Sequence, residues 1–308
     1  GAACGTIVMA AMAVATGVAD AVVCYRAFNE RSGRRFGAGV QDLPLAATAE
    51  RAQFSWTTPF GQLTPASWVA MVARRYMHLY GATSEDFGRV AVAGRKHAAN
   101  NPAAWFHNEP ITLEDHQASR WIVDPLHLLD CCQESDGGQA LVVVSAERAR
   151  DLPNKPALIV AGAQGAGDEQ WTMTSFFRDD IAHLPEMKVV ADELWTSSGL
   201  TPADIQTAIL YDHFTPYVLM QLEEFGFCGR GEAKDFIADG ALELGGRLPI
   251  NTHGGQLGEA YIHGMNGIAE AVRQIRGTSV NQVDSVENVL VTAGTGVPTS
   301  GLILGVDR

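Results

Sequence analysis

Residues 251–267 hold the densest group of side chains that could carry chemistry in this 308-residue chain. Glycines recur through the stretch, and they let a backbone approach a ligand closely or adopt positive φ angles. Four side chains that can exchange protons stand among them: His253, Glu259, Tyr261 and His263. Because they precede an expected helix, whose N-terminus favours negative charge, the pattern indicates a reactive loop that stabilises a developing anion. A tight turn with surface polar groups is the alternative interpretation.

The cysteines indicate neither a metal centre nor a disulfide framework. The chain has five of them, an odd number without any CxxC pair: Cys4, Cys24, Cys131, Cys132 and Cys228. Structural zinc sites and secreted disulfide scaffolds need cysteines at regular paired spacing. We therefore expect no metal ligands and a cytoplasmic location, with most of these thiols packed as small hydrophobic groups.

The composition is that of a folded globular protein. Hydrophobic residues make up 46% and charged residues 19%, and the length allows two core-building units or one large α/β unit. The net charge of −13 argues against a nucleic acid or an anionic membrane as the main partner, because both need a cationic surface. The most apolar segment, residues 1–27, is too interrupted for a membrane span and predicts a buried helix and a buried strand. Because the chain enters this helix at once, we expect an N-terminal part to be missing.

Alternating helices and strands are expected to position these groups. The predicted helices cover residues 6–16, 65–80, 84–100, 187–198, 217–225 and 264–275. The predicted strands cover residues 20–25, 138–145, 157–163, 205–211, 289–293 and 300–306. Continuous apolar runs at 138–145 and 157–163 indicate strands that are buried on both faces. The alternation favours a mostly parallel sheet with helices on both faces, and a weak likeness between residues 6–25 and 264–293 indicates two copies of a βαβαβ unit.

The reactive loop resembles the NxxGG…GHPxGxxG loop of the thiolase superfamily, in its sterol-carrier-protein x (SCP-x) branch. The matching positions are Asn251, Gly254, Gly255, Gly264 and Gly267. Two more stretches agree with that branch: residues 124–138 resemble its PL…DC…SDGA segment, and residues 210–214 resemble its His-Asp-x-Phe strand end. Together these matches span nearly the whole chain.

The resemblance implies a thiolase fold of the α/β class, in which duplicated βαβαβ halves pack as αβαβα layers and a loop domain is inserted. The expected divisions are 1–40 for the remainder of the N-terminal half, 41–136 for the insertion, 137–152 for the last strand of that half and 153–308 for the C-terminal half. The resemblance also implies that a coenzyme A thioester binds along the loop, at Gly254, Gly255 and Gly264.

This sequence departs from thiolases at the catalytic positions. Tyr261 stands where thiolases have the histidine of GHP, and Tyr211 replaces the histidine of His-Asp-x-Phe. No cysteine lies near residues 293–296, the region of the second thiolase thiol. Cys4 lies a few residues inside the position of the acylated cysteine, so we do not assign it that role. Thiolysis and Claisen condensation need a thiolate that a histidine activates, and both parts look degraded here.

Two tyrosines suit a different reaction on the same kind of thioester. Their ordinary pKa near 10 is poor for activating a thiol, but it fits proton exchange with alcohols and enolates. In a retro-aldol cleavage one group takes the proton of a β-hydroxyl, the Cα–Cβ bond breaks, and a second group protonates the thioester enolate. We expect Tyr211 to be the base and Tyr261 the acid, and we expect His263 to be structural. Supporting roles in orientation or oxyanion binding are expected for Asp212, His213, His253, Gly294 and Gly296.

Within the superfamily, the run from Ala260 to Gly267 resembles the actinobacterial lipid-transfer-protein aldolases of steroid side-chain degradation. This resemblance implies cleavage of 17-hydroxy-3-oxo-4-pregnene-20-carboxyl-CoA to androstenedione and propionyl-CoA, without a further cofactor. It also implies a homodimer bound to an OB-fold partner subunit in a heterotetramer. Two alternatives stay open: a thiolase-like acyltransferase whose nucleophilic cysteine lies outside this chain, and a non-catalytic lipid-CoA binding protein.

Overall fold

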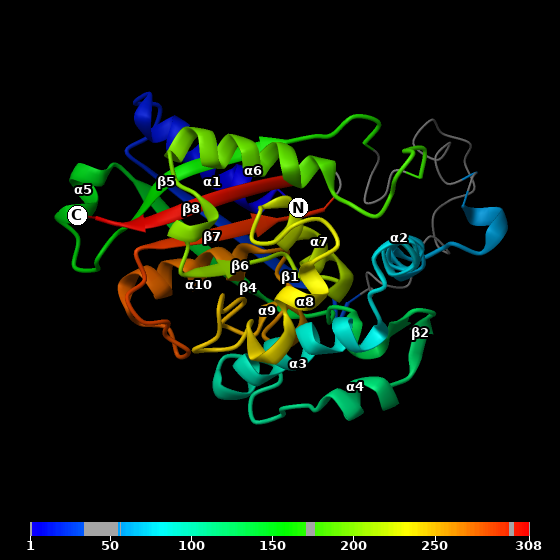
Figure 1. Ribbon diagram of the computed structural model, residues 1–308. Helices are drawn as coiled ribbons and strands as arrows, with labels where there is room; N and C mark the ends of the chain where they lie inside the picture. Colours follow the sequence, from blue (N-terminus) through cyan, green and yellow to red (C-terminus); the bar gives the residue numbers. More distant parts are fainter. Residues whose placement is uncertain (1, 34–54, 56, 171–175, 296–298, 308) are drawn as a thin grey trace.

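The computed structural model describes residues 2–33, 55, 57–170, 176–295 and 299–307. Its larger sheet has four strands in the order β5, β8, β7, β6. These strands are β5 (Ala157–Gly165), β6 (Thr207–Ile209), β7 (Asn288–Ala293) and β8 (Thr299–Val306). The helix α6 (Pro185–Ser198) covers one face of this sheet, where it packs on β5 and β8 (Figure 1).

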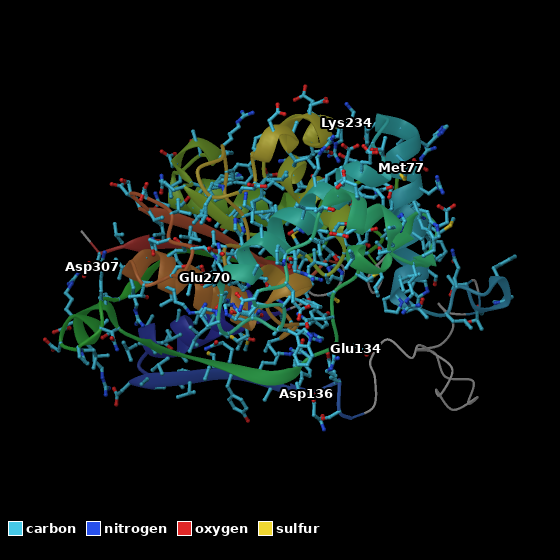
Figure 2. The ribbon with its side chains drawn as sticks, turned by 90° about the horizontal axis from the view of Figure 1, so that it is seen from below. Met77, Glu134, Asp136, Lys234, Glu270 and Asp307 are labelled. Atoms are coloured by element: carbon cyan, nitrogen blue, oxygen red, sulfur yellow. The ribbon has the colours of Figure 1, made fainter. Side chains whose placement is uncertain are left out.

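Two helices separate this sheet from a second one. α1 (Ala3–Ala15) contacts β5 and β8 on one side and β1 and β4 on the other, and α10 (Met265–Arg276) likewise contacts both β7 and β4. The second sheet pairs β1 (Ala21–Asn29) with β4 (Asp136–Val144), and the two strands run side by side in Figure 2. The layers therefore follow the order helix, sheet, helix pair, sheet, in agreement with the predicted layered α/β fold.

The strand directions differ from the predicted, mostly parallel sheet. Among the described strands only β6 and β7 pair in parallel, whereas the β5–β8, β7–β8 and β1–β4 pairs are antiparallel. The link between β7 and β8 is too short to hold a crossover helix, so these two strands must form a hairpin. Alternation of helices and strands along the chain does not reveal this pairing.

The β1–β4 sheet is also less buried than the apolar runs predicted. Val23 in β1 and Val142 in β4 are 62% and 63% exposed. In α1, Met9 and Met12 are exposed as well, so this helix is buried along one side only. Because α1 and α10 cover one face of the two-stranded sheet, alternate side chains of each strand point away from that cover. The prediction of two-sided burial was therefore wrong.

Helix ends followed local signals more closely. α2 (Pro65–Tyr80) and α3 (Ser84–Asn100) have the predicted bounds, and each begins with a capping box, at Thr64 and at Thr83. Other elements are displaced by a few residues. β6 ends at Ile209 instead of residue 211, which leaves the following residues free of the strand ladder.

The remaining elements lie around the layers. The described part of the segment between β1 and β4 lies beside and below the larger sheet in Figure 1. It contains α2, α3, α4 (Leu113–Ala118), β2 (Trp121–Val123) and β3 (Leu126–His127). The other helices are α5 (Ala146–Arg150), α7 (Thr215–Glu224), α8 (Ala233–Phe236) and α9 (Gly255–Gly258), and α7 is buried along its whole length. Within the described ranges, no helix has the length and apolar composition needed to cross a membrane.

Candidate active site

Tyr211 and Tyr261 meet inside the molecule. Tyr211 lies two residues beyond the end of β6, and Tyr261 lies in the turn between α9 and α10. Their hydroxyl oxygens are 3.1 Å apart, within hydrogen-bond distance, and their rings meet edge to face. The two side chains are only 4% and 7% exposed. The structure thus brings together the two phenols that the sequence singled out.

The backbone of Tyr211 is held by two neighbouring elements. Its N–H donates to Thr292 Oγ1 in β7 at 2.9 Å, and its carbonyl accepts from Gln221 Nε2 in α7 at 2.9 Å. Thr292 Oγ1 in turn donates to Gln221 Oε1 at 2.6 Å. This closed set of buried hydrogen bonds fixes the position from which the Tyr211 ring projects.

Tyr261 is fixed by a backbone hydrogen bond and by stacking. Its N–H donates to Ser135 Oγ at 2.9 Å, and its ring stacks on His263 with centroids 4.3 Å apart. Gly264 follows at a φ of 88° and caps α10. A Cβ at Gly264 would lie 3.3 Å from the Tyr211 ring, so the absence of a side chain leaves room for the tyrosine pair.

Asp212 anchors the glycine loop. Its Oδ1 accepts from the backbone N–H of Gln256 at 2.8 Å, and burial raises the pKa of its carboxyl. Gly255 has a φ of 67°, and a Cβ there would collide with the Asp212 carboxylate. The role expected for Asp212 was to orient Tyr211; its described hydrogen bond reaches the loop instead.

His213 packs directly beside Tyr211. The ring centroids are 4.8 Å apart, and the other side of the imidazole stacks on Tyr217. His213 Nε2 lies 3.1 Å from Thr295 Oγ1, next to Gly294, whose φ is 81°. Burial lowers the pKa of His213 to about 3, so this ring is neutral at physiological pH. Gly296, the other glycine expected here, lies outside the described residues.

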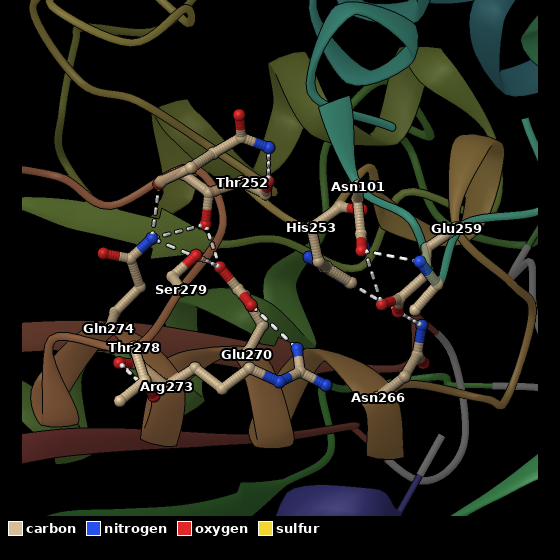
Figure 3. A network of polar contacts seen from close by, with 12 residues as sticks. Asn101, Thr252, His253, Glu259, Asn266, Glu270, Arg273, Gln274, Thr278 and Ser279 are labelled. Atoms are coloured by element: carbon tan, nitrogen blue, oxygen red, sulfur yellow. Dashed lines mark hydrogen bonds and ion pairs between the residues drawn. The ribbon is translucent and has the colours of Figure 1, made fainter. Parts of the chain in front are cut away.

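His253 belongs to a polar network that supports the loop (Figure 3). Asn101 Nδ2 donates to the His253 carbonyl at 2.9 Å and to Glu259 Oε1 at 3.1 Å. Asn266 Nδ2 donates to the other oxygen of Glu259 at 2.8 Å, and His253 Nε2 lies 3.9 Å from that oxygen. These contacts give His253 a supporting position in the loop, and the expected oxyanion role stays a prediction.

A second carboxylate secures the other end of the same loop. Glu270 accepts from Thr252 Oγ1 and from Ser279 Oγ, each at 2.6 Å, and pairs with Arg273 at 2.8 Å (Figure 3). Burial alone would raise the pKa of Glu270, but the facing His253 and these donors bring it below its ordinary value. The carboxylate is therefore a fixed anion, and it joins the loop to α10.

None of the cysteines offers an accessible thiolate. Cys4 is fully buried, and its Sγ lies 3.8 Å from the carbonyl of Val291. Burial raises the thiol pKa at all five cysteines, and it raises that of Cys131 to about 12. Among the described residues, no group of three His, Cys, Asp or Glu side chains is placed to hold a metal ion.

The sequence did not predict the residues that hydrogen-bond to the backbone of Tyr211 and Tyr261. Gln221 in α7, Thr292 in β7 and Ser135, just before β4, make the backbone contacts described above. His263 was expected to be structural, and its stacking on Tyr261 agrees with a supporting position. These residues reach the site only through tertiary contacts, and no local sequence pattern marks them.

Comparison with known proteins defines the class. The family described as "Thiolase C-terminal domain-like" matches residues 167–305. A monomeric SCP2-thiolase-like protein type 1 from Mycobacterium smegmatis has a similar structure, with a TM-score of 0.72 at 19% identity over 99% of this chain and 61% of that one. Together with the alternating layers, these matches show the thiolase fold.

Relatives of higher sequence identity show which family within the thiolase superfamily this chain belongs to. The chain is 73% identical over its whole length to "Steroid side-chain-cleaving aldolase" of Thermomonospora curvata, and covers 79% of that protein. It is 69% identical, over 99% of its length, to "17-hydroxy-3-oxo-4-pregnene-20-carboxyl-CoA lyase" of Mycobacterium tuberculosis, again covering 79%. The structure of the "Ltp2-ChsH2(DUF35) aldolase" superposes with a TM-score of 0.95 at 72% identity, over 100% of this chain and 78% of that one. The chain therefore belongs to the thiolase superfamily and, within it, to the family of these steroid side-chain-cleaving aldolases.

Proposed function

We propose that this protein cleaves 17-hydroxy-3-oxo-4-pregnene-20-carboxyl-CoA to androstenedione and propionyl-CoA by a retro-aldol reaction. The observation that carries the proposal is the 3.1 Å contact between the buried Tyr211 and Tyr261 hydroxyls, which stand where the sequence resemblance implies the two thiolase histidines. Relatives at 69–73% identity are named as an aldolase and a lyase of this kind. The raised pKa of the thiols in the described chain argues against an acyl-enzyme formed on one of these cysteines.

Burial determines how the phenols can work. It raises the pKa of both Tyr211 and Tyr261 above the ordinary value for tyrosine, so both are neutral at rest. Neither tyrosine is therefore present as a phenolate base before the reaction begins. Two phenols in one hydrogen bond can instead accept a proton on one oxygen and release a proton from the other, without a lasting charge on either.

The bond changes then balance without any added reagent. The C17 hydroxyl gives its proton to Tyr211, and the hydroxyl oxygen forms the ketone of androstenedione. The C17–C20 bond breaks, and its electron pair passes into the thioester as an enolate. Tyr211 passes its own proton to Tyr261, and Tyr261 protonates C20 to give propionyl-CoA. General acid–base catalysis of this kind contributes about 100-fold to 10,000-fold in rate.

The glycine loop supplies the environment for the thioester. In this proposal the backbone at Gly254, Gly255 and Gly264 approaches the coenzyme A ester, and the N–H of Gly294 and the His253 side chain are donors for the enolate oxygen. Asp212 and His213 keep the loop and the Tyr211 ring in place. The reaction needs no cofactor beyond the coenzyme A of the substrate.

The proposed assembly is a homodimer bound to an OB-fold partner subunit in a heterotetramer, in the cytoplasm. Support comes from the matched aldolase structure, whose description names ChsH2(DUF35) beside Ltp2. Cross-linking mass spectrometry and light scattering of the purified protein, with and without such a partner, measure both parts of this proposal.

Removing either phenol tests the proposed function. We expect Tyr211→Phe and Tyr261→Phe each to lower kcat by about 100-fold or more, because each variant breaks the proton path while keeping the ring. The assay follows androstenedione released from the steroid-CoA in the presence of the partner protein. Tyr25→Phe, at a tyrosine that is 73% exposed, is the matched control and should keep full activity. Full activity in both Tyr211→Phe and Tyr261→Phe would contradict the proposal.

A further inference from the structure

Behind Tyr261 lies a second group of ionisable side chains that the proposed reaction does not use. His263 stacks on Tyr261 on one face and on Phe28 on the other, where the centroids are 4.5 Å apart. Its Nδ1 lies 3.2 Å from Arg26 Nη2, and its Nε2 lies 3.2 Å from Glu30 Oε1. Arg26 and Glu30 both belong to the region of β1, so this strand contacts the catalytic loop through one histidine.

The chemistry of arginine decides which nitrogen of His263 carries the proton. A guanidinium can only donate, so Nδ1 must be the accepting nitrogen in the contact with Arg26. The proton of the neutral ring therefore resides on Nε2, which donates to Glu30 Oε1. Burial, together with the adjacent Arg26, lowers the pKa of His263 to about 3, so the ring stays neutral.

The surroundings of the Glu30 carboxyl allow it to gain or lose its proton near neutral pH. The residue is 93% buried, and its second oxygen, Oε2, is buried without a hydrogen-bond partner among the described residues. Burial, with a contribution from the nearby Glu134 and Asp136 and against the opposing charge of Arg26, raises the pKa of Glu30 to about 7. Figure 2 shows Glu134 and Asp136 close together at the end of β4 that pairs with the end of β1.

The charge of Glu30 reaches the reacting phenol. Burial is the main cause of the raised pKa of Tyr261, and an ionised Glu30 adds to that rise; it adds likewise to the raised pKa of Cys132. An ionised carboxylate makes Tyr261 a weaker acid because it opposes the negative charge left on the phenol. A protonated Glu30 removes this effect and still accepts from His263 through its carbonyl oxygen.

We propose that Glu30 and His263 form a positioning unit behind Tyr261, in which the charge of Glu30 sets how readily Tyr261 gives its proton to the enolate. The inference rests on the proposed retro-aldol function. The tyrosine pair is neutral through the physiological range, so in this proposal the change in charge of Glu30 makes turnover depend on pH near neutrality. His263 stacks on the Tyr261 ring and contacts Glu30 through Nε2, so it links these two side chains.

A pH profile of Glu30→Gln tests this unit. Wild-type kcat should fall by about threefold as pH rises through about 7, because ionised Glu30 weakens the acid. Glu30→Gln should keep the higher rate across the same range with KM unchanged. Glu134→Gln, which removes a repelling charge but keeps Glu30, should move the inflection to lower pH without abolishing it. His263→Asn, which tolerates the positive φ, should lower kcat more than KM.

A spectroscopic readout keeps the test independent of turnover. In protein labelled with ¹³C-glutamate, the carboxyl resonance that disappears in Glu30→Gln should titrate near pH 7. Titration of that resonance below about pH 5, or identical pH profiles for wild type and both glutamate variants, would overturn the inference while the retro-aldol activity stands. Absence of activity in the wild type would instead defeat the proposed function. Thermal melting confirms that each variant is folded before it is compared.

Discussion

Tyr211 and Tyr261 share one hydrogen bond, so the two side chains act as a unit. One hydroxyl donates to the other across 3.1 Å, and only the remaining proton and lone pairs face other groups. Neither phenol is held by its hydroxyl alone: Gln221 and Thr292 fix the backbone of Tyr211, and Ser135 fixes that of Tyr261. Because the backbone contacts fix the positions of the two tyrosines, their hydroxyl groups are available for proton transfer.

A double-mutant cycle measures this coupling. Because both phenols serve one proton path, Tyr211→Phe should cost nearly the full rate loss, and adding Tyr261→Phe should cost little more. The double variant should lie within about threefold of the slower single variant in kcat. Rate losses that multiply would mean that the two hydroxyls act in separate steps. Single-turnover kinetics with saturating partner protein give the required constants.

The loop from residue 251 to 264 is the element that places the site. Its backbone is held by Asp212 through Gln256, and by Asn101 and Asn266 through Glu259. Positive φ angles at glycines inside the loop allow these contacts, so the shape of the loop depends on missing side chains as much as on present ones.

Gly255→Ala should disrupt this element strongly. The new Cβ would collide with the Asp212 carboxylate and would also strain a φ of 67°, so we expect a loss of about 3 kcal/mol and most of the activity. Gly277→Ala is the matched control, since its φ of 72° is similar but no atom lies within 4 Å of the new Cβ. The control should lose only about 1 kcal/mol. Equal losses in urea denaturation would show that the Asp212 contact is unimportant.

The layers of the whole molecule bury several neutral histidines. Burial lowers the pKa of His97 to about 4 and those of His213 and His263 to about 3. An unfolded histidine titrates near 6.5, so in the window below that value the unfolded chain binds protons that the folded chain excludes. Each of these side chains therefore removes stability as the pH falls below about 6.5. Glu30 acts in the opposite sense, because its raised pKa stabilises the fold at low pH.

His97→Gln isolates one of these contributions. The stability of the wild type relative to this variant should fall by about 1.4 kcal/mol per pH unit between about pH 6.5 and 4, or about 3 kcal/mol in total. The reason is that only the wild type must exclude a proton from position 97. Chemical denaturation of both proteins over this range gives the difference. A difference that stays constant with pH would contradict the lowered pKa of His97.

Local patterns allowed part of this structure to be predicted. The predicted starts of α2 and α3 match the structure, where each helix begins at a capping box whose hydrogen bonds join residues only three apart. Predictions that depended on neighbours in space failed: β1 and β4 are half exposed, and most of the described strand pairs are antiparallel. An apolar run predicts that a strand has a buried face, but it does not show whether one face or both faces are buried.

The residue types at 211 and 261, read against the loop pattern around them, were enough to indicate the family and a chemistry based on proton exchange between phenols. Family resemblance carries such information because the motif positions are contiguous in the chain. Folding alone brings the two hydroxyls within 3.1 Å, seats His263 between Tyr261 and Phe28, and gathers Glu30 behind them. Apart from the stacking of His263 on its near neighbour Tyr261, these contacts join residues dozens to hundreds of positions apart. Burial at these contacts then shifts the pKa values of the side chains, which the sequence alone does not show.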